Sequence, residues 1–281
     1  MSFAESIKQI PPRDWIGVFV FPGIWVVGCL VFAVRCAIWG MPRTPRMERL
    51  AKTKVLPRYI LEYGYWMLTL PVRATVALGI SADVVTYSSL VVSAISAVLC
   101  GLGEVVWGGW FLFAAFALDA MDGMVARLAG TSSDRGEYLD SLIDRYADFL
   151  CALGFMWLYR NDPLPLVLAA LGMIGSSVMG YARAKGEACG VDPNVGWAQR
   201  HERGVILGFA TVMSPLVDAL VEPGVAHPRH WLVIFGLAIV ALLTNVTAIW
   251  RGQFVVSRLA RKKAEPKPAE RGAVDEKRVA A

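Results

Sequence analysis

Long stretches without a charged residue constrain this chain more than any other feature of its sequence. Each is about 20 residues long, the length that an α-helix needs to cross the hydrocarbon core of a bilayer. A chain segment in lipid must satisfy its own backbone hydrogen bonds, which a helix does. The stretches are Trp15–Val34, Val84–Gly103, Leu164–Ala182 and Trp231–Trp250. The sequence therefore predicts an all-α polytopic membrane protein.

Together with the last three of these stretches, three further segments form a predicted core of six transmembrane helices. Val105–Leu118 and Phe149–Tyr159 are apolar and continue into acidic segments, which predicts two amphipathic spanning helices of about 24 residues each. Gly204–Val221 is a weaker candidate, because Pro215 and Asp218 interrupt it. The composition agrees, since 18% of the residues are charged, against about 25% in soluble domains.

Basic residues predict how the chain is oriented. They gather in residues 35–73, 183–203 and 258–263, whereas the opposite connections hold only Arg160 and Arg229. By the positive-inside rule the three basic regions are cytoplasmic. We therefore expect a protein of the cell's inner membrane whose acidic segments face the cytoplasm. Nothing in the sequence indicates a nucleic-acid partner.

The predicted organisation has three parts. Residues 1–72 hold the first hydrophobic stretch, a basic cytoplasmic segment and an interfacial helix over Tyr59–Arg73, where aromatic residues surround a lone Glu62. We favour a spanning first stretch, although Pro22 and Gly23 also allow a bent or re-entrant one. Residues 73–251 form the six-helix core. Residues 252–281 form a charged cytoplasmic tail, too polar from Ala264 onward to fold by itself.

Four acids carry the predicted chemistry. Asp119 and Asp122 are three residues apart and Asp140 and Asp144 are four apart, so each pair projects from one face of a helix. Uncompensated charges at a membrane helix are costly, and carboxylate oxygens are the ligands that Mg²⁺ or Mn²⁺ prefers. Four acids could hold two ions, which would bind a pyrophosphate and orient an attacking hydroxyl.

Two other interpretations of these acids stay open. Membrane acids also form structural clamps with basic residues, or line ion pathways. A clamp would explain two acids better than four, and a cation transporter would carry charges deep in several helices or repeated broken helices. The small residues Gly123, Ala126 and Gly136 leave room for a ligand beside the acids, and Arg127 can reach a phosphate.

The order of these residues resembles the signature of a known family. The string Asp119-x2-Asp122-Gly123-x2-Ala126-Arg127-x8-Gly136-x3-Asp140-x3-Asp144 matches that of the CDP-alcohol phosphotransferases position for position, and the resemblance covers roughly Arg73 to Arg251. It implies a six-helix membrane fold, usually a homodimer, with a cavity where a CDP-linked donor meets an alcohol. The implied metal ligands are Asp119, Asp122, Asp140 and Asp144, with Asp144 also the base, and the residues at the donor nucleotide are Gly123, Ala126, Arg127 and Gly136.

One departure from the family lies upstream. Relatives often carry Pro-Asn-x-x-Thr before the first core helix, where this chain reads Ala82-Asp83-Val84-Val85-Thr86. The loss of proline leaves the metal chemistry untouched. Asp83 and Thr86 are expected to cap this helix.

Two basic strings bear on the acceptor. Residues 181–187 and 199–203 resemble the Tyr-x-Arg-Ala-x-x-Glu and Glu-Arg-x-Glu-Arg strings of phosphatidylinositol-phosphate synthases, with Gln199 where relatives often have Glu. The resemblance implies that Arg183, Arg200 and Arg203 face the metal site and bind a phosphate on the acceptor. Alternatively, these residues merely follow the positive-inside rule and bind anionic lipid headgroups.

The implied reaction is transfer of the phosphatidyl group of CDP-diacylglycerol to a hydroxyl of a polar alcohol, with release of CMP. Inositol phosphate is the favoured acceptor. Within the family, the alternatives are glycerol phosphate as acceptor, or an enzyme that uses CDP-choline or CDP-ethanolamine with diacylglycerol. A carboxylate-lined cation transporter, the alternative from another class, would release no CMP.

Overall fold

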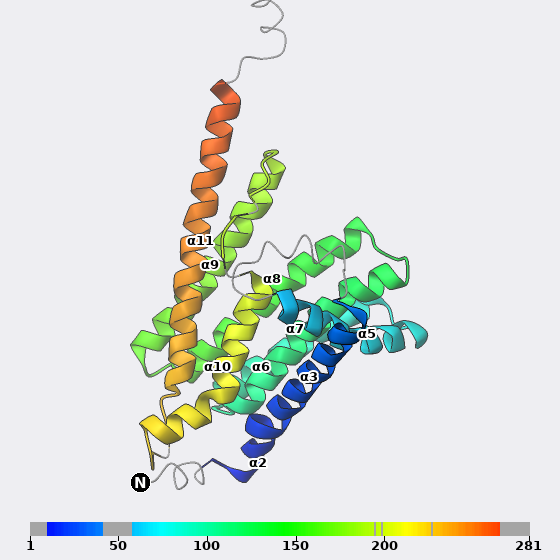
Figure 1. Cartoon of the computed structure of the whole chain (residues 1–281). Coiled ribbons are helices and arrows are strands. Elements are labelled where there is room, and N and C mark those ends of the chain that lie inside the picture. The colour runs from blue at the N-terminus through cyan, green and yellow to red at the C-terminus, as the bar shows by residue number, and fades with distance from the viewer. Residues whose placement is uncertain (1–9, 42–57, 194, 198, 226, 265–281) are drawn as a thin grey trace, which may run out of the picture.

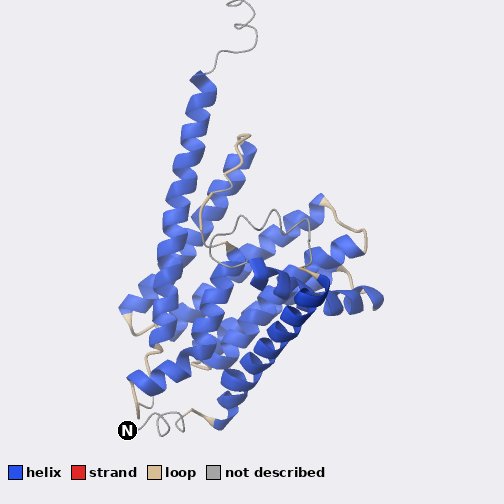
Figure 2. Ribbon diagram, viewed as in Figure 1, coloured by secondary structure: helices blue, strands red, loops and turns tan. Residues whose placement is uncertain are grey.

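A computed structural model describes residues 10–41, 58–193, 195–197, 199–225 and 227–264. Within these ranges the chain is helical and contains no strand, which confirms the predicted all-α class (Figure 2). The basic segment 42–57 and the end of the tail lie outside the described residues. In chain order the elements are α2 (Pro12–Trp15), the π-helical η1 (Ile16–Val20), α3 (Phe21–Trp39), α5 (Arg58–Ala77), α6 (Ala82–Gly101), α7 (Val105–Leu128), α8 (Asp134–Leu158), α9 (Pro163–Ala188), α10 (Arg200–Val221) and α11 (Trp231–Ala264).

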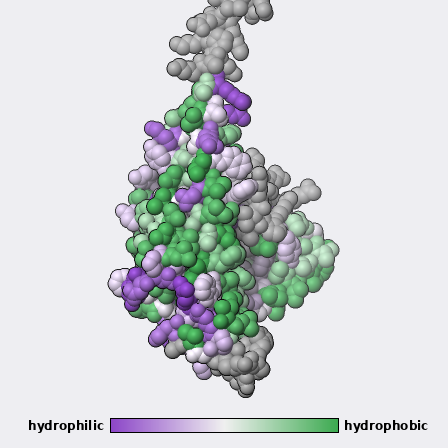
Figure 3. Space-filling model, turned by 90° about the vertical axis from the view of Figure 1, so that its left-hand side faces the viewer, coloured by the Kyte–Doolittle hydropathy of each residue, from purple (hydrophilic) through white to green (hydrophobic). Residues whose placement is uncertain are grey.

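The hydropathy of the helices is that of a membrane protein. Among the described residues, five segments are long and apolar enough to cross a bilayer: Pro12–Trp39, Ala82–Gly101, Pro163–Ala188, Arg200–Val221 and Trp231–Lys262. On the face shown in Figure 3, hydrophobic residues form a broad area, with hydrophilic residues gathered towards its two ends. The chain is therefore an integral, polytopic membrane protein. That the acid-bearing α7 and α8 also span stays a prediction; they are 24 and 25 residues long.

Close helix contacts bring the acid-bearing helices together. The helix α6 packs against both α7 and α8, and α10 packs against α7 (Figure 1). Ser96 on α6 donates a hydrogen bond of 2.8 Å to the carbonyl oxygen of Gly108 on α7. A side chain at Gly154 on α8 would collide with the backbone of Ala97 on α6. Small residues at such crossings allow membrane helices to approach closely, so α7 and α8 lie on neighbouring sides of α6.

The first hydrophobic stretch is helical from Pro12 to Trp39, and that it spans the membrane stays a prediction. The π-helical turn lies directly before Pro22, whose ring removes a backbone donor. This helix packs on α7, where Trp110 donates a hydrogen bond of 2.9 Å from Nε1 to the Gly17 carbonyl. An added Cβ at Gly17 would collide with Val106. The stretch is thus one continuous helix docked on the core.

The helix α5 covers the region predicted to lie at the membrane interface. Its Tyr63 donates a hydrogen bond of 2.9 Å to the carbonyl of Trp25 on α3, and Phe32 of α3 packs against the rings of Tyr59 and Trp66. Glu62 is 1% exposed, so its side chain is buried within the protein. The interfacial position of α5 stays a prediction.

The predicted helix over Gly204–Val221 is present and uninterrupted, and the chain stays helical further towards its C-terminus than expected. Pro215 and Asp218 do not interrupt α10, because the buried Asp218 accepts a hydrogen bond of 3.1 Å from Ser214 and lies 2.7 Å from Nδ1 of His230. The tail expected from residue 252 is helical as far as Ala264, since α11 continues beyond its apolar part.

The predicted cap of α6 is wrong. The helix begins at Ala82, and the side chain that accepts a hydrogen bond from its first turn is that of Ser81, 3.5 Å from the nitrogen of Val84. Asp83 and Thr86 lie inside the helix, where their side chains face its neighbours. Asp83 forms an ion pair of 2.7 Å with Arg135 on α8, and Thr86 reaches α7.

Candidate active site

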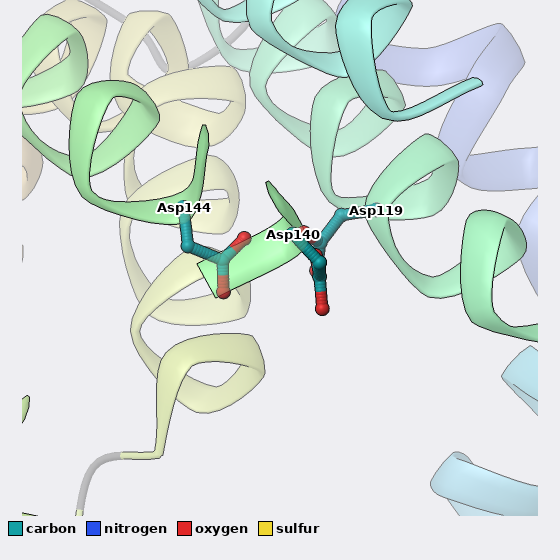
Figure 4. Close-up of side chains that lie close together, drawn as sticks. All are labelled: Asp119, Asp140 and Asp144. Carbon is teal, nitrogen blue, oxygen red and sulfur yellow. The ribbon is translucent and has the colours of Figure 1, made fainter. Parts of the chain in front are cut away.

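Three carboxylates from two helices meet in one group. Asp119 comes from α7, and Asp140 and Asp144 come from α8, one helical turn apart (Figure 4). Each offers one oxygen, and these three oxygens all lie within 4.8 Å of one another. All three residues are half-buried. Oxygens at this spacing, from a hard donor set, fit a divalent cation.

Asp122, the fourth predicted ligand, is not part of this cluster of three carboxylates. It is 6% exposed, and its Oδ2 accepts a hydrogen bond of 2.8 Å from the Thr86 hydroxyl on α6. The backbone nitrogen of Gly123 donates to its Oδ1 at 2.5 Å. The structure therefore brings three of the four acids together and fixes the fourth one turn along α7. Thr86 occupies the threonine position of the upstream family string, which was the one signal that could have revealed this contact.

An arginine from α10 lies among the carboxylates. Nη1 of Arg200 lies 2.7 Å from Oδ1 of Asp144 and also pairs with Asp119, while its Nε lies 3.4 Å from Oδ1 of Asp148. Arg203, one turn later, places its Nη2 2.8 Å from Oδ2 of Asp148. Carboxylates this close repel one another unless a positive charge compensates them. The guanidinium supplies that charge here, and a divalent cation would supply it equally.

Asp148 was not predicted as a site residue because it lies outside the family signature. It follows Asp144 by four residues, so it continues the same face of α8 by one more turn. That spacing was the available signal.

The start of α10 explains why the arginines lie where they do. Gln199 is the N-cap, and a capping box joins its side chain to the third residue of the helix while Glu202 accepts a hydrogen bond of 2.9 Å from the Gln199 nitrogen. This box fixes the first turn, from which Arg200 and Arg203 project. Glutamine serves the box without the glutamate that relatives often carry at this position.

Arg183, the third predicted arginine, does not share these ion pairs. Its Nε lies 2.9 Å from Oε1 of Glu187 on the same helix, and its side chain is 62% exposed. Two arginines that sequence reasoning did not single out are more enclosed. Arg251 donates to the carbonyls of Val195 and Met179, and Arg145 to that of Ser176.

The residues predicted for the donor nucleotide flank the turn between α7 and α8. Ala126 and Arg127 lie near the end of α7, and Gly136 lies in the first turn of α8. The Gly136 nitrogen donates a hydrogen bond of 3.2 Å to the side chain of the N-cap Ser133. An added Cβ at Gly136 would meet only the Ser133 hydroxyl, at 3.5 Å, so packing within the described chain does not require a glycine there. Open space at this position suits a ligand.

The fold and the site define an integral membrane protein with a carboxylate group suited to a divalent cation. The family model of the CDP-alcohol phosphatidyltransferases matches residues 79–253. The chain belongs to this family, which makes it a membrane transferase and confirms the resemblance seen in the sequence. Membership favours the transferase interpretation over a cation transporter or a structural clamp.

Two relatives and one solved structure show which members of the family this chain is similar to. The phosphatidylinositol phosphate synthase of Mycolicibacterium smegmatis is 30% identical over 191 residues, covering 66% of this chain and 85% of the relative. The archaetidylinositol phosphate synthase of Methanothermobacter thermautotrophicus is 27% identical over 189 residues, with coverages of 67% and 89%. The crystal structure of Mycobacterium tuberculosis phosphatidylinositol phosphate synthase with CDP-DAG bound has a TM-score of 0.57 at 24% identity, covering 66% of this chain and 92% of that one. The last comparison shows that the fold is shared.

Proposed function

We propose that this protein transfers the phosphatidyl group of CDP-diacylglycerol to a hydroxyl of inositol phosphate and releases CMP. The observation that carries the proposal is the cluster of three carboxylates on α7 and α8, with an arginine pair from α10 directly beside it. The carboxylates suit an activated donor that arrives with a metal, and the arginines suit an acceptor that carries a phosphate of its own. The names of the relatives, phosphatidylinositol phosphate synthase and archaetidylinositol phosphate synthase, support an inositol phosphate headgroup in the product.

In the proposed reaction the acceptor's hydroxyl oxygen attacks the phosphorus that carries the diacylglycerol. The bond from that phosphorus to the CMP oxygen breaks, and CMP leaves with the bonding electrons. Asp144 takes the proton of the hydroxyl. Asp119, Asp140 and Asp144, with Asp122 one turn along α7, would hold Mg²⁺ or Mn²⁺, and we propose two ions. When bound, these ions neutralise charge on the donor phosphates and on the departing CMP.

The remaining site residues bind the two substrates in this proposal. Gly123, Ala126, Arg127 and Gly136 surround the donor nucleotide at the turn between α7 and α8. Arg200 and Arg203 bind the acceptor's phosphate, with Arg183 at the outer edge of the same basic region. We further propose that this site faces the cytoplasm at the inner membrane, that the six-helix core of residues 73–251 forms a homodimer, and that residues 1–72 anchor it.

The test is a direct assay of the purified full-length protein. CDP-diacylglycerol and Mn²⁺ are supplied with inositol phosphate, inositol or glycerol phosphate, and both CMP and the lipid product are measured. We expect turnover with inositol phosphate. Turnover with glycerol phosphate alone would reject the acceptor, and CMP-free reactions with every acceptor would reject the function.

A variant tests the role of Asp144. Asp144→Asn should lower CMP release by at least about 100-fold, since the amide cannot take the hydroxyl proton. Asp162→Asn is a matched control, because Asp162 pairs with Arg229 away from the carboxylate group. Normal turnover in Asp144→Asn protein would remove this residue from the role of base.

A further inference from the structure

Asp148 pairs with Arg200 and Arg203, two arginines of the proposed acceptor site, although it is not part of the family signature. Its Oδ1 lies 3.4 Å from Nε of Arg200, and its Oδ2 lies 2.8 Å from Nη2 of Arg203. The two oxygens of one carboxylate thus fix two guanidinium groups that come from successive turns of α10. We infer that Asp148 is a positioning residue, which keeps this pair in place and keeps Arg200 available to the acceptor when a metal ion binds. The inference rests on the proposed function.

The position of Arg200 explains why such a residue is needed. Nη1 of Arg200 pairs with Asp119 and Asp144, two of the three carboxylates that would bind the cation, while its Nε points towards Asp148. One side of the guanidinium therefore compensates the charge that a dication would compensate, and the other side has a partner outside the metal group. Two positive charges near the same oxygens oppose each other. Arg200 and a dication consequently compete for Asp119 and Asp144.

Asp148 gives Arg200 a second partner in that competition. When the cation takes Asp119 and Asp144, Arg200 retains an ion pair with Asp148 and remains beside the site. The side chains of Arg200, Arg203 and Asp148 are 19%, 7% and 14% exposed, so water screens these charges little. Removing one partner of such an enclosed ion pair is costly.

There is also space for the arginines to move. A cavity of about 50 Å³ lies inside the helix bundle next to the ion pairs of Asp148 with Arg200 and Arg203. Asp148, Arg200 and Arg203 line it together with apolar residues such as Phe116 and Leu207. The guanidinium groups therefore border empty volume, and a shift of Arg200 away from the carboxylates does not require the helices to separate.

This competition predicts that substitutions of Arg200 and of Asp148 change the affinity for the metal ion in opposite directions. Arg200→Gln removes the competing cation, so Mn²⁺ should bind about 5- to 10-fold more tightly. Asp148→Asn leaves Arg200 dependent on Asp119 and Asp144, so Mn²⁺ should bind several-fold more weakly. The dissociation constant is measured by electron paramagnetic resonance of free Mn²⁺, with purified full-length protein and no substrate.

A double variant separates this mechanism from a simple loss of negative charge. If Asp148 acts through Arg200, adding Asp148→Asn to Arg200→Gln should change Mn²⁺ affinity by less than about twofold. Asp148→Glu keeps the carboxylate, so it should restore wild-type affinity, and it also serves as the folded variant if Asp148→Asn is unstable. Arg229→Gln, whose ion pair with Asp162 lies elsewhere, is the matched control.

Kinetics give a second readout. Asp148→Asn should raise the KM for inositol phosphate about tenfold and change kcat much less, because it misplaces two acceptor-binding groups without touching the reacting atoms. Unchanged or weaker Mn²⁺ binding in Arg200→Gln would overturn the inference, as would an undiminished effect of Asp148→Asn in the double variant. Wild-type protein that releases no CMP would instead reject the proposed function, and the Mn²⁺ experiment would still test the competition.

Discussion

The contact between Thr86 and Asp122 offers the sharpest test of how the signature acids are held. Thr86→Val keeps the shape of the side chain and removes the hydroxyl that donates to Oδ2 of Asp122 at 2.8 Å. The same hydroxyl lies 3.0 Å from the carbonyl oxygen of Ala82 on its own helix, so its one proton is shared between two acceptors, with the shorter distance to Asp122. Asp122 is 6% exposed, so water can replace the lost donor only poorly.

The structure sets the expected size of the effect. A hydrogen bond to a charged group contributes about 1.5 to 3 kcal/mol, which corresponds to about 10- to 100-fold in a binding constant. Loss of a group that orients a metal-binding side chain typically has an effect of this order. We therefore expect Thr86→Val to weaken Mn²⁺ binding and to lower CMP release at limiting Mn²⁺ by about 10- to 100-fold.

The control is Thr86→Ser, which keeps the hydroxyl and should stay within a few-fold of wild type. Both variants are titrated with Mn²⁺. Electron paramagnetic resonance of the free ion gives the Mn²⁺ affinity, and CMP release gives the turnover. Wild-type Mn²⁺ affinity and turnover in Thr86→Val protein would refute the claim that this hydrogen bond serves the metal site.

Three further outcomes follow from the site and its support. Gly136→Ala should leave thermal stability unchanged or slightly higher, because its Cβ meets only a hydroxyl at 3.5 Å, yet it should raise the KM for CDP-diacylglycerol; an unchanged KM would contradict a nucleotide at this position. Gly17→Ala should lower stability by about 1 to 3 kcal/mol through overpacking, measured by thermal denaturation in detergent. Gly23→Ala, where an added Cβ meets nothing within 4 Å, is its control, and equal stability of the two variants would contradict the packing described. Chelation by EDTA should abolish CMP release and Mn²⁺ should restore it; turnover in EDTA would exclude a metal-dependent reaction.

The sequence predicted the elements better than their ends. Charge-free stretches of membrane-spanning length identify helices because lipid leaves the backbone no other solution, and the five apolar segments appear where those stretches and Gly204–Val221 predicted them. The boundaries depended on single side chains whose partners lie far away in the sequence. Asp218 argued against a helix until Ser214 and His230 paired with it, and Asp83 and Thr86 read as caps until their partners on α8 and α7 were known.

The same limit applies to the site. The spacing of Asp140 and Asp144 correctly predicted that they lie together, because helical periodicity is local. The same rule paired Asp119 with Asp122, but contacts between helices decide which of these two joins the α8 acids. No local rule could distinguish Asp122, which binds a hydroxyl on α6, from the three acids that meet. The arginines divided likewise: Arg200 reaches the acids from α10, whereas Arg183 pairs within its own helix. Contacts between helices determine which of these side chains lie at the site, and a single sequence does not reveal those contacts.

Charge compensation links the stability of this site to its activity. Asp119, Asp144 and Asp148 lie on helices whose other faces are largely apolar, and such acids persist only with positive charge nearby. Arg200 meets that need from the first turn of a helix whose start is fixed by the capping box of Gln199 and Glu202. Arg200 can therefore keep these carboxylates close together without repulsion driving α7 and α8 apart. If a cation binds as we propose, three of its carboxylate ligands already lie close together, and its binding would displace one guanidinium. Because that guanidinium also has Asp148 as a partner, we propose that it stays beside the site and binds a phosphorylated acceptor once the metal is bound.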